Sequence, residues 1–169
     1  MKQLDIIQGK LIKEYQDLQK SYSIQTTFDN KWLFISDLGG RLKQWSIPRQ
    51  ELEKDYKTIH FSIWAITITH NCKYLFTSDM AGFMKQWDIN HKNLIKDYRK
   101  IHNKGIWSMT VTKNDKFLFT SDRDGYLKQW NISLQRLVKN FGKIHFSELK
   151  HILVLNDSNT MFTANSSSM

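Results

Sequence analysis

Three histidines, His60, His102 and His145, recur at spacings of 42 and 43 residues, and imidazole is the commonest metal-binding side chain. A metal centre needs its ligands within about 2 Å of one ion, commonly with thiolates or carboxylates among them. Residues that recur once per repeat are held apart by the repeats themselves. We therefore expect these histidines to make structural hydrogen bonds, and we predict neither a metal site nor a cofactor.

The sequence contains none of the common catalytic motifs. There is no phosphate-binding glycine loop, no His-Glu-x-x-His and no Gly-x-Ser-x-Gly. The single cysteine, Cys72, falls in a predicted turn and is a poor candidate for a nucleophile. We predict that no residue is catalytic and that the protein is not an enzyme.

Tryptophans could stack on nucleic-acid bases or enclose a cation. Trp45, Trp87 and Trp130 recur once per repeat, which is the pattern of core packing. Trp64 and Trp107 each begin a strand just after a histidine loop. These two are therefore candidates for contact with a partner.

The chain carries 25 Lys and Arg against 16 Asp and Glu, a net charge of +9. Such a charge could neutralise phosphates, so binding of nucleic acid, RNA in particular, through a basic surface is one hypothesis. Many of the cations instead fall on a predicted edge strand and alternate with acidic residues, and lysine on an edge discourages aggregation. These cations are Lys54, Lys57, Lys96, Arg99, Lys100, Lys139 and Lys143. We prefer the interpretation as a solvated edge and keep nucleic-acid binding as the alternative.

The whole chain is organised in repeats of about 42 residues. Lys-Gln-Trp ends at each of the three repeated tryptophans, and an Ile-His pair follows 15 residues after each one. Degenerate copies occur at both ends: residues 1–6 align with 84–89, and residues 161–165 align with 118–122. Repeats of this period indicate stacked units. The approximate units of this single domain are 1–20 (partial), 21–60, 61–102, 103–145 and 146–169 (partial).

Within a unit the apolar pattern has a period of two, which predicts strands. Residues 63–69 alternate apolar and polar types, whereas residues 74–77 are apolar on both faces. A Ser-Asp-x-x-Gly turn and two further runs, such as 126–130 and 94–98, complete four strands. Such a sheet must bury both faces against its neighbours. Radial packing of these sheets gives an all-β fold, the β-propeller.

Over nearly its full length the chain resembles the WD-repeat family of β-propellers. Trp87-Asp88 matches the family's Trp-Asp dipeptide, and the three histidines match the histidine of its Gly-His pair. The resemblance implies about four blades of four antiparallel strands, in a whole or partial propeller. It also implies a non-catalytic scaffold for protein–protein interaction.

The resemblance further implies a hydrogen-bond network in each blade that links His, a Ser or Thr, an Asp and Trp. In the third unit the network residues would be His102, Thr120 or Ser121, Asp124 and Trp130. In the second unit they would be His60, Thr77 or Ser78 and Trp87, with Asp79 as a substitute for the absent acid. In the first they would be Gln19, Ser36 and Trp45, and His145 would serve the last unit.

Loop residues that differ between units are the candidates for partner binding, because the framework around them repeats. They are Leu38, Phe61, Met80, Asn103, Lys104, Arg123 and Phe146, in addition to the strand residues Trp64 and Trp107. We expect them to bind a protein partner whose identity the sequence does not indicate.

Sixteen predicted strands allow three arrangements: a fragment of a longer array, a self-closed four-blade ring, or a dimer that shares eight blades. We favour a fragment or a piece that depends on association. No apolar run approaches the 18–20 residues of a membrane helix, and an acid at position 5 argues against a signal peptide. With its single cysteine, we expect the protein to be cytoplasmic or nuclear and not inserted in a membrane.

Overall fold

The computed structural model describes residues 2–4, 10–14, 21–155 and 159–166. All regular structure in these residues is β-strand, and none of them forms a helix that is long and apolar enough to cross a membrane. The strands are β1 (Lys2–Leu4), β2 (Leu11–Glu14), β3 (Ser21–Thr26), β4 (Trp32–Asp37), β5 (Arg41–Ser46), β6 (Glu51–Thr58), β7 (Ile63–Ile68), β8 (Tyr74–Asp79), β9 (Phe83–Asp88), β10 (Asn93–Lys100), β11 (Ile106–Val111), β12 (Phe117–Asp122), β13 (Tyr126–Asn131), β14 (Arg136–Lys143), β15 (Leu149–Val154) and β16 (Met161–Asn165).

The strands form three four-stranded antiparallel sheets, β3-β4-β5-β6, β7-β8-β9-β10 and β11-β12-β13-β14, in which strands adjacent in sequence pair. Two two-stranded sheets, β1-β2 and β15-β16, precede and follow them. The prediction of an all-β chain of four-stranded antiparallel blades is confirmed. The described residues contain three complete blades and two half-blades.

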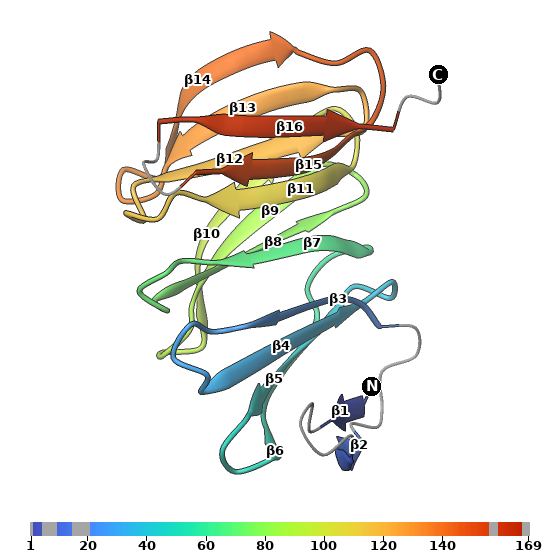
Figure 1. The fold of residues 1–169 in the computed structure, drawn as a ribbon, viewed down its shortest axis with the longest axis vertical. Coiled ribbons are helices and arrows are strands. Elements are labelled where there is room, and N and C mark those ends of the chain that lie inside the picture. Colours follow the sequence, from blue (N-terminus) through green and yellow to red (C-terminus); the bar gives the residue numbers. More distant parts are fainter. Residues whose placement is uncertain (1, 5–9, 15–20, 156–158, 167–169) are drawn as a thin grey trace.

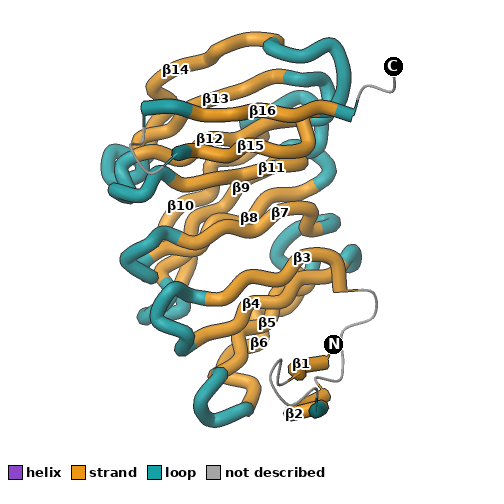
Figure 2. Tube along the Cα trace, in the orientation of Figure 1, coloured by secondary structure: helices purple, strands orange, loops and turns teal. Residues whose placement is uncertain are grey.

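The blades stack against one another through their first strands. β3 contacts β7, β7 contacts β11, and β11 contacts β15, while β6, β10 and β14 are the last strands of their sheets. Figure 1 shows the resulting series of blades, and Figure 2 shows the short loops that join their strands. The half-blades β1-β2 and β15-β16 lie at opposite ends of this series (Figure 1). The described strands therefore form an open arc and not the self-closed ring of four blades.

The core lies between successive blades, because each sheet is apolar on both faces. Phe34 and Leu75 pack with Trp87 between the first and second complete blades. Phe76 and Leu118 pack with Trp130 between the second and third. Burying a side chain of this size contributes about 1.5–3 kcal/mol, so the repeated junctions are the main source of stability.

The Ser-Asp-x-x-Gly turns hold the ends of the sheets together. In the second complete blade, Asp79 Oδ1 accepts hydrogen bonds from the N–H groups of Ala81 and Phe83, both at 2.9 Å. Gly82 has a φ of +92°, and a Cβ there would lie 2.1 Å from the carbonyl oxygen of His102. Glycine is required at this turn because the next histidine loop packs directly against its backbone.

Candidate functional site

Each of the second and third complete blades contains a buried chain of four hydrogen-bonded side chains. His60 Nδ1 lies 3.0 Å from Asp79 Oδ2, and His60 Nε2 lies 2.9 Å from Thr77 Oγ1. Trp87 Nε1 donates to the same threonine oxygen at 3.0 Å. In a neutral His60 ring, Nδ1–H can donate to Asp79 while Nε2 accepts the proton of the Thr77 hydroxyl. Each polar group of the four side chains that takes part in these contacts then has a partner. We call this chain the blade network.

The third complete blade repeats this geometry. His102 Nδ1 lies 3.0 Å from Asp122 Oδ2, His102 Nε2 lies 2.8 Å from Thr120 Oγ1, and Trp130 Nε1 donates to that oxygen at 3.0 Å. His102 and Trp130 are buried, so water does not replace these partners. The two blade networks brace the histidine loops from inside the sheets.

The expectation that serines join the network is wrong. Successive residues of a strand face opposite sides of the sheet, so Thr77 points toward the tryptophan and Ser78 away from it. Ser78 Oγ donates instead to the carbonyl oxygen of Ala65 at 3.4 Å. Ser36 Oγ likewise donates to a carbonyl oxygen of β3, and Ser121 Oγ donates to the carbonyl oxygen of Leu149 in the next blade.

The expectation for Asp124 is also wrong. The carboxylate beside His102 belongs to Asp122, at the end of β12 and next to the histidine loop. Asp124 lies within the turn and contributes its backbone N–H, which donates to Asp122 Oδ1 at 3.0 Å. The acid two residues earlier, considered above as a substitute, is the network residue in both blades.

The remaining blades hold incomplete versions of the network. In the first complete blade, Ile35 stands where the other blades have threonine, so no hydroxyl faces Trp45 at that position. Gln19, expected at the histidine position, lies outside the described residues. In the last half-blade, His145 Nε2 lies 2.8 Å from Thr163 Oγ1, and Asn165 occupies the position of the network acid.

Burial and hydrogen bonding shift the pKa values of the network acids. Burial alone raises the pKa of Asp79, but the hydrogen bond from His60 and those from backbone N–H groups outweigh it, so the pKa lies below 3.8. Asp122 has a lowered pKa for the same reasons. Both acids are therefore ionised at neutral pH. Burial also raises the pKa of Tyr98 to about 12.

Hydrogen bonds join neighbouring loops at one end of the sheets, and we call the surface of these loops the His-loop face. It comprises residues 37–40, 59–62, 79–82, 101–105, 122–125 and 144–148. In each of these loops an isoleucine N–H donates at 2.9 Å to the carbonyl oxygen of a turn glycine. The pairs are Ile59 with Gly40, Ile101 with Gly82, and Ile144 with Gly125. The predicted contacts Leu38, Phe61, Met80, Asn103, Lys104, Arg123 and Phe146 all lie on this face.

Large apolar side chains are exposed on the His-loop face. Phe61 is 77% and Phe146 98% exposed, and Met80 and Leu38 are exposed as well. Beside Phe61 a shallow cavity of about 310 Å³ is lined by Ile59, His60, Phe61, Asp79, Ala81, Phe83, Lys85 and Asp97. A second hollow of about 140 Å³ is lined by His102, Asn103, Asp122, Tyr126, Lys128 and Asn140. Arg123, elsewhere on this face, is already engaged, because its Nε donates to Glu148 Oε1 at 2.7 Å.

Trp64 and Trp107 are not displayed on the loops. Their rings pack against each other between β7 and β11, with centroids 4.6 Å apart, and both are only partly exposed. Lys150 Nζ lies 5.6 Å from the centroid of the Trp107 ring. These three residues recur one per blade on the first strands, so they form a column between blades and not a free aromatic surface.

Several of the predicted edge lysines cover aromatic rings of their own blades. Lys96 Nζ lies 5.0 Å from the centroid of the Tyr98 ring and donates to the carbonyl oxygen of Gln135 at 2.7 Å. Lys139 and Lys54 lie over the rings of Phe141 and Tyr56. Part of the positive charge is therefore used within and between blades.

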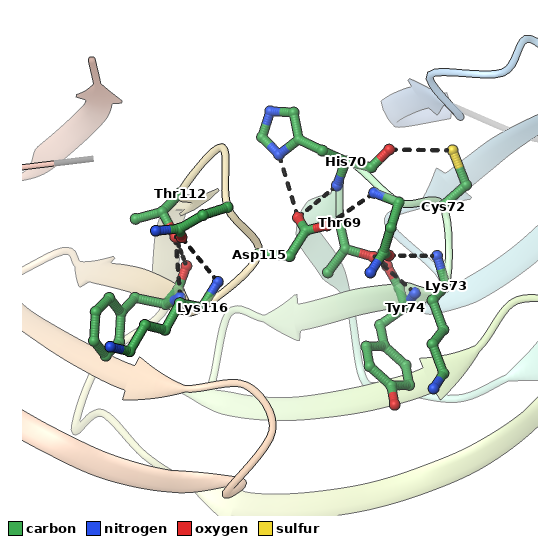
Figure 3. Close-up of polar contacts among 11 residues, drawn as sticks. Thr69, His70, Cys72, Lys73, Tyr74, Thr112, Asp115 and Lys116 are labelled. Atoms are coloured by element: carbon green, nitrogen blue, oxygen red, sulfur yellow. Dashed lines mark hydrogen bonds and ion pairs between the residues drawn. The ribbon is translucent and has the colours of Figure 1, made fainter. Parts of the chain in front are cut away.

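Hairpin turns at the opposite end of the sheets are tied between blades (Figure 3). Asp115 accepts hydrogen bonds from the N–H groups of His70 and Asn71, at 2.6 and 2.8 Å, across 45 and 44 residues of sequence. The His70 ring stacks on Phe28 of the preceding blade at 4.4 Å. Cys72 lies in the same turn, and its Sγ contacts the carbonyl oxygen of His70 at 3.6 Å. Sequence reasoning missed this contact because Asp115 and His70 occupy different positions of the repeat.

Comparison with known proteins places one repeat directly. A family model described as "WD domain, G-beta repeat" matches residues 94–131, from β10 through the His102 loop to Trp130. No curated protein matches the chain. Among solved structures, "Structure of U3-55K" superposes with a TM-score of 0.75 at 13% identity, over 80% of this chain and 42% of that chain. The chain thus spans less than half the length of that neighbour.

The matched repeat and the blade geometry agree. The network of the matched residues, with His102 and Trp130, has its counterpart with the same contacts at His60 and Trp87. The same four-stranded sheet occurs three times. Residues 94–131 therefore match a WD repeat, and the described blades have a β-propeller type of fold.

Proposed function

We propose that this chain is a non-catalytic scaffold whose protein partner binds the His-loop face. The observation that carries the proposal is the cavity of about 310 Å³ beside Phe61, a phenylalanine that is 77% exposed. Exposed aromatic residues next to a hollow are typical of the residues that dominate binding energy at protein interfaces. WD-repeat proteins in general mediate protein interactions, which agrees with this use of the face.

The frame beneath this face supports rigid display. The His60 loop is fixed to Gly40 by backbone hydrogen bonds and to Asp79 through the blade network. Loops held in this way lose little conformational entropy when a partner binds, so more of the contact energy appears as affinity.

The cavity also suggests what part of a partner would enter it. Phe61 and Phe83 supply apolar walls. Lys85 supplies a positive charge, and Asp79 and Asp97 supply negative charges. Lys85 Nζ already donates to the carbonyl oxygen of Ile59 at 2.5 Å. An apolar side chain with a polar backbone on either side, as in an extended peptide, would match this lining.

The test compares three forms of the chain in affinity capture from native cells, read by quantitative mass spectrometry. They are the unchanged chain, the double variant Phe61→Ser/Phe83→Ser, and the control Val138→Ser. Val138 is also an exposed apolar residue, but it lies on the outer strand β14. A partner that binds the His-loop face is lost with the double variant and retained with the control.

Binding of the purified partner to each form then measures how far the double variant weakens Kd. Removal of two aromatic contacts should weaken Kd by at least about tenfold, since each interface anchor contributes on the order of 1–2 kcal/mol. Equal capture by all three forms would refute the assignment of this face. If the captured ligand is instead an RNA that Arg99→Glu/Lys100→Glu releases, the nucleic-acid alternative holds.

A further inference from the structure

The hairpin β15-β16 is the first half of a blade. Leu149 pairs with Asn165, just as Ile106 pairs with Asp122 at positions 43 residues earlier, and the irregularity after the first pair recurs. In the complete blades the second strand pairs on both sides, with the first and the third. Among the described strands, β16 pairs only with β15. The β16 backbone therefore presents an edge that fits a third strand.

The hairpin β1-β2 is the second half of a blade. Lys2 pairs with Glu14 and Leu4 with Leu11, which repeats the pairing of β9 with β10 at positions 83 residues later. Within the described part of the chain, β1 pairs only with β2. The missing neighbour of β1 is a second strand, and the missing neighbour of β16 is a third strand. The two half-blades are thus complementary in register.

Apolar side chains are uncovered at both ends of the arc. Phe162 of β16 is 60% exposed, whereas Phe76 and Phe119 at the same position of complete blades are 0% and 4% exposed. At the other end, Ile24 of β3 is 54% exposed, and its counterpart Met109 is 8% exposed. Phe76 and Met109 belong to one buried cluster. The positions held by Phe162 and Ile24 therefore lie in one buried cluster at each junction of two complete blades.

A cavity of about 340 Å³ lies beside the half-blade β15-β16. Its lining includes Phe117, Phe119, Phe141, Val154 and Met161. In the complete blades a tyrosine holds the position of Phe141 and packs edge-on against the tryptophan of the next blade. The ring centroids of Tyr56 and Trp87 are 5.4 Å apart, and those of Tyr98 and Trp130 are 5.6 Å apart. The cavity is thus the space that the third strand of the blade would fill.

We propose that two copies of this chain associate by completing each other's half-blades. The hairpin β1-β2 of each copy adds to the β16 edge of the other, and Leu4 then holds the tryptophan position of the completed blade. The register of β8 with β9 then sets Phe162 opposite Gln3 and Met161 opposite Leu4.

The arc favours a second copy over closure within one chain. The two half-blades lie at opposite ends of the arc (Figure 1), and the chain superposes on 42% of the length of its structural neighbour. One arc therefore corresponds to somewhat less than half of that chain's length. Two copies give six complete and two composite blades in a two-fold symmetric ring, and such a ring leaves no exposed strand edge between half-blades.

Light scattering after size-exclusion chromatography of the full chain tests the proposal. We expect a mass of twice 20.2 kDa. Phe162→Lys should reduce the mass to that of one chain, because this side chain is exposed in the single chain and buried in the ring. The control Val138→Lys should leave the mass doubled. Ile95 holds the same position in the preceding blade and is exposed although its junction is complete, so Val138 should stay exposed in the ring. A mass of 20.2 kDa for the unchanged chain, or an open-ended series of oligomers, would overturn it.

Disulfide trapping tests the register independently of the charge substitution. One chain carries Cys72→Ser and Gln3→Cys, and a second, differently tagged chain carries Cys72→Ser and Phe162→Cys. Each chain then has one thiol, so a mixed disulfide can form only between chains. In the control, the second chain carries Val138→Cys in place of Phe162→Cys. We expect the mixed disulfide to form at least tenfold faster with Phe162→Cys than with this control. Equal rates would contradict the proposal, and so would a double variant Gln3→Cys/Phe162→Cys that closes its disulfide within a monomer.

Discussion

Replacement of Thr120 by valine removes one hydroxyl and leaves two buried groups without a partner. The Thr120 Oγ1 atom lies 2.8 Å from His102 Nε2 and accepts the Trp130 Nε1 proton at 3.0 Å. Valine has nearly the same shape as threonine, so packing changes little. The change therefore isolates the hydrogen-bonding contribution of the blade network.

The magnitude follows from the burial of the two groups that lose their partner. His102 is 2% and Trp130 is 8% exposed, so water does not take the place of the hydroxyl. Each buried polar group left without a partner costs about 1–3 kcal/mol. Two such groups give about 2–6 kcal/mol, and we expect the free energy of unfolding to fall by roughly 3 kcal/mol.

Urea-induced unfolding, followed by tryptophan fluorescence and by far-ultraviolet circular dichroism at one protein concentration, measures this loss. The control is Thr110→Val in the same blade, because Thr110 lies on β11 and its hydroxyl makes no hydrogen bond among the described residues. Its effect should stay within about 0.5 kcal/mol. The single concentration matters because association changes apparent stability.

A double-mutant cycle with Trp130→Phe completes the experiment. If Thr120 and Trp130 act through their shared hydrogen bond, the double variant should be more stable than the sum of the two losses predicts, by about 1 kcal/mol. A loss below about 1 kcal/mol for Thr120→Val, or strict additivity with Trp130→Phe, would refute the structural role assigned to the network.

Three further predictions concern the acids and the turns. The pKa values of Asp79 and Asp122 lie below 3.8 in the folded state, so their contribution to stability is complete above that pH and is lost as pH falls through the lowered pKa. Urea titrations between about pH 6 and pH 3 should show a shallower acid-induced loss of stability for Asp122→Asn. Asp115→Asn leaves one oxygen for two N–H donors and should cost about 1–2 kcal/mol in the same assay, and no change would contradict the interblade role. Gly82→Ala should cost about 3 kcal/mol or more and Gly142→Ala only about 1 kcal/mol, because both have positive φ but only the first would place a Cβ against backbone. Thermal unfolding compares the two, and equal shifts in Tm would contradict this account.

The sequence determined the kind of sheet and its repetition. Alternation of apolar and polar residues in 63–68 and 106–111 predicts the strands β7 and β11, because successive side chains of a strand point to opposite faces of the sheet. The recurrence of Trp87 at Trp130 predicts a core position of each blade, and both are buried. These features depend on local patterns, which are readable along the chain.

Choices between neighbouring residues depended on three-dimensional geometry. Thr77 and Ser78 both carry hydroxyls, and only the orientation of β8 relative to β9 decides which one faces Trp87. The choice of Asp122 over Asp124 depends in the same way on where the turn begins. A sequence motif restricts such residues to a short window, but strand pairing selects one of them.

Contacts between blades were decided only by the tertiary structure. Asp115 binds the turn at His70, and Trp64 packs on Trp107, although neither pair follows from a motif within one repeat. The twist and spacing of the stacked sheets bring these residues together. Each repeat specifies its own hydrogen bonds and turns, whereas the surface that one blade offers the next depends on side chains far apart in sequence.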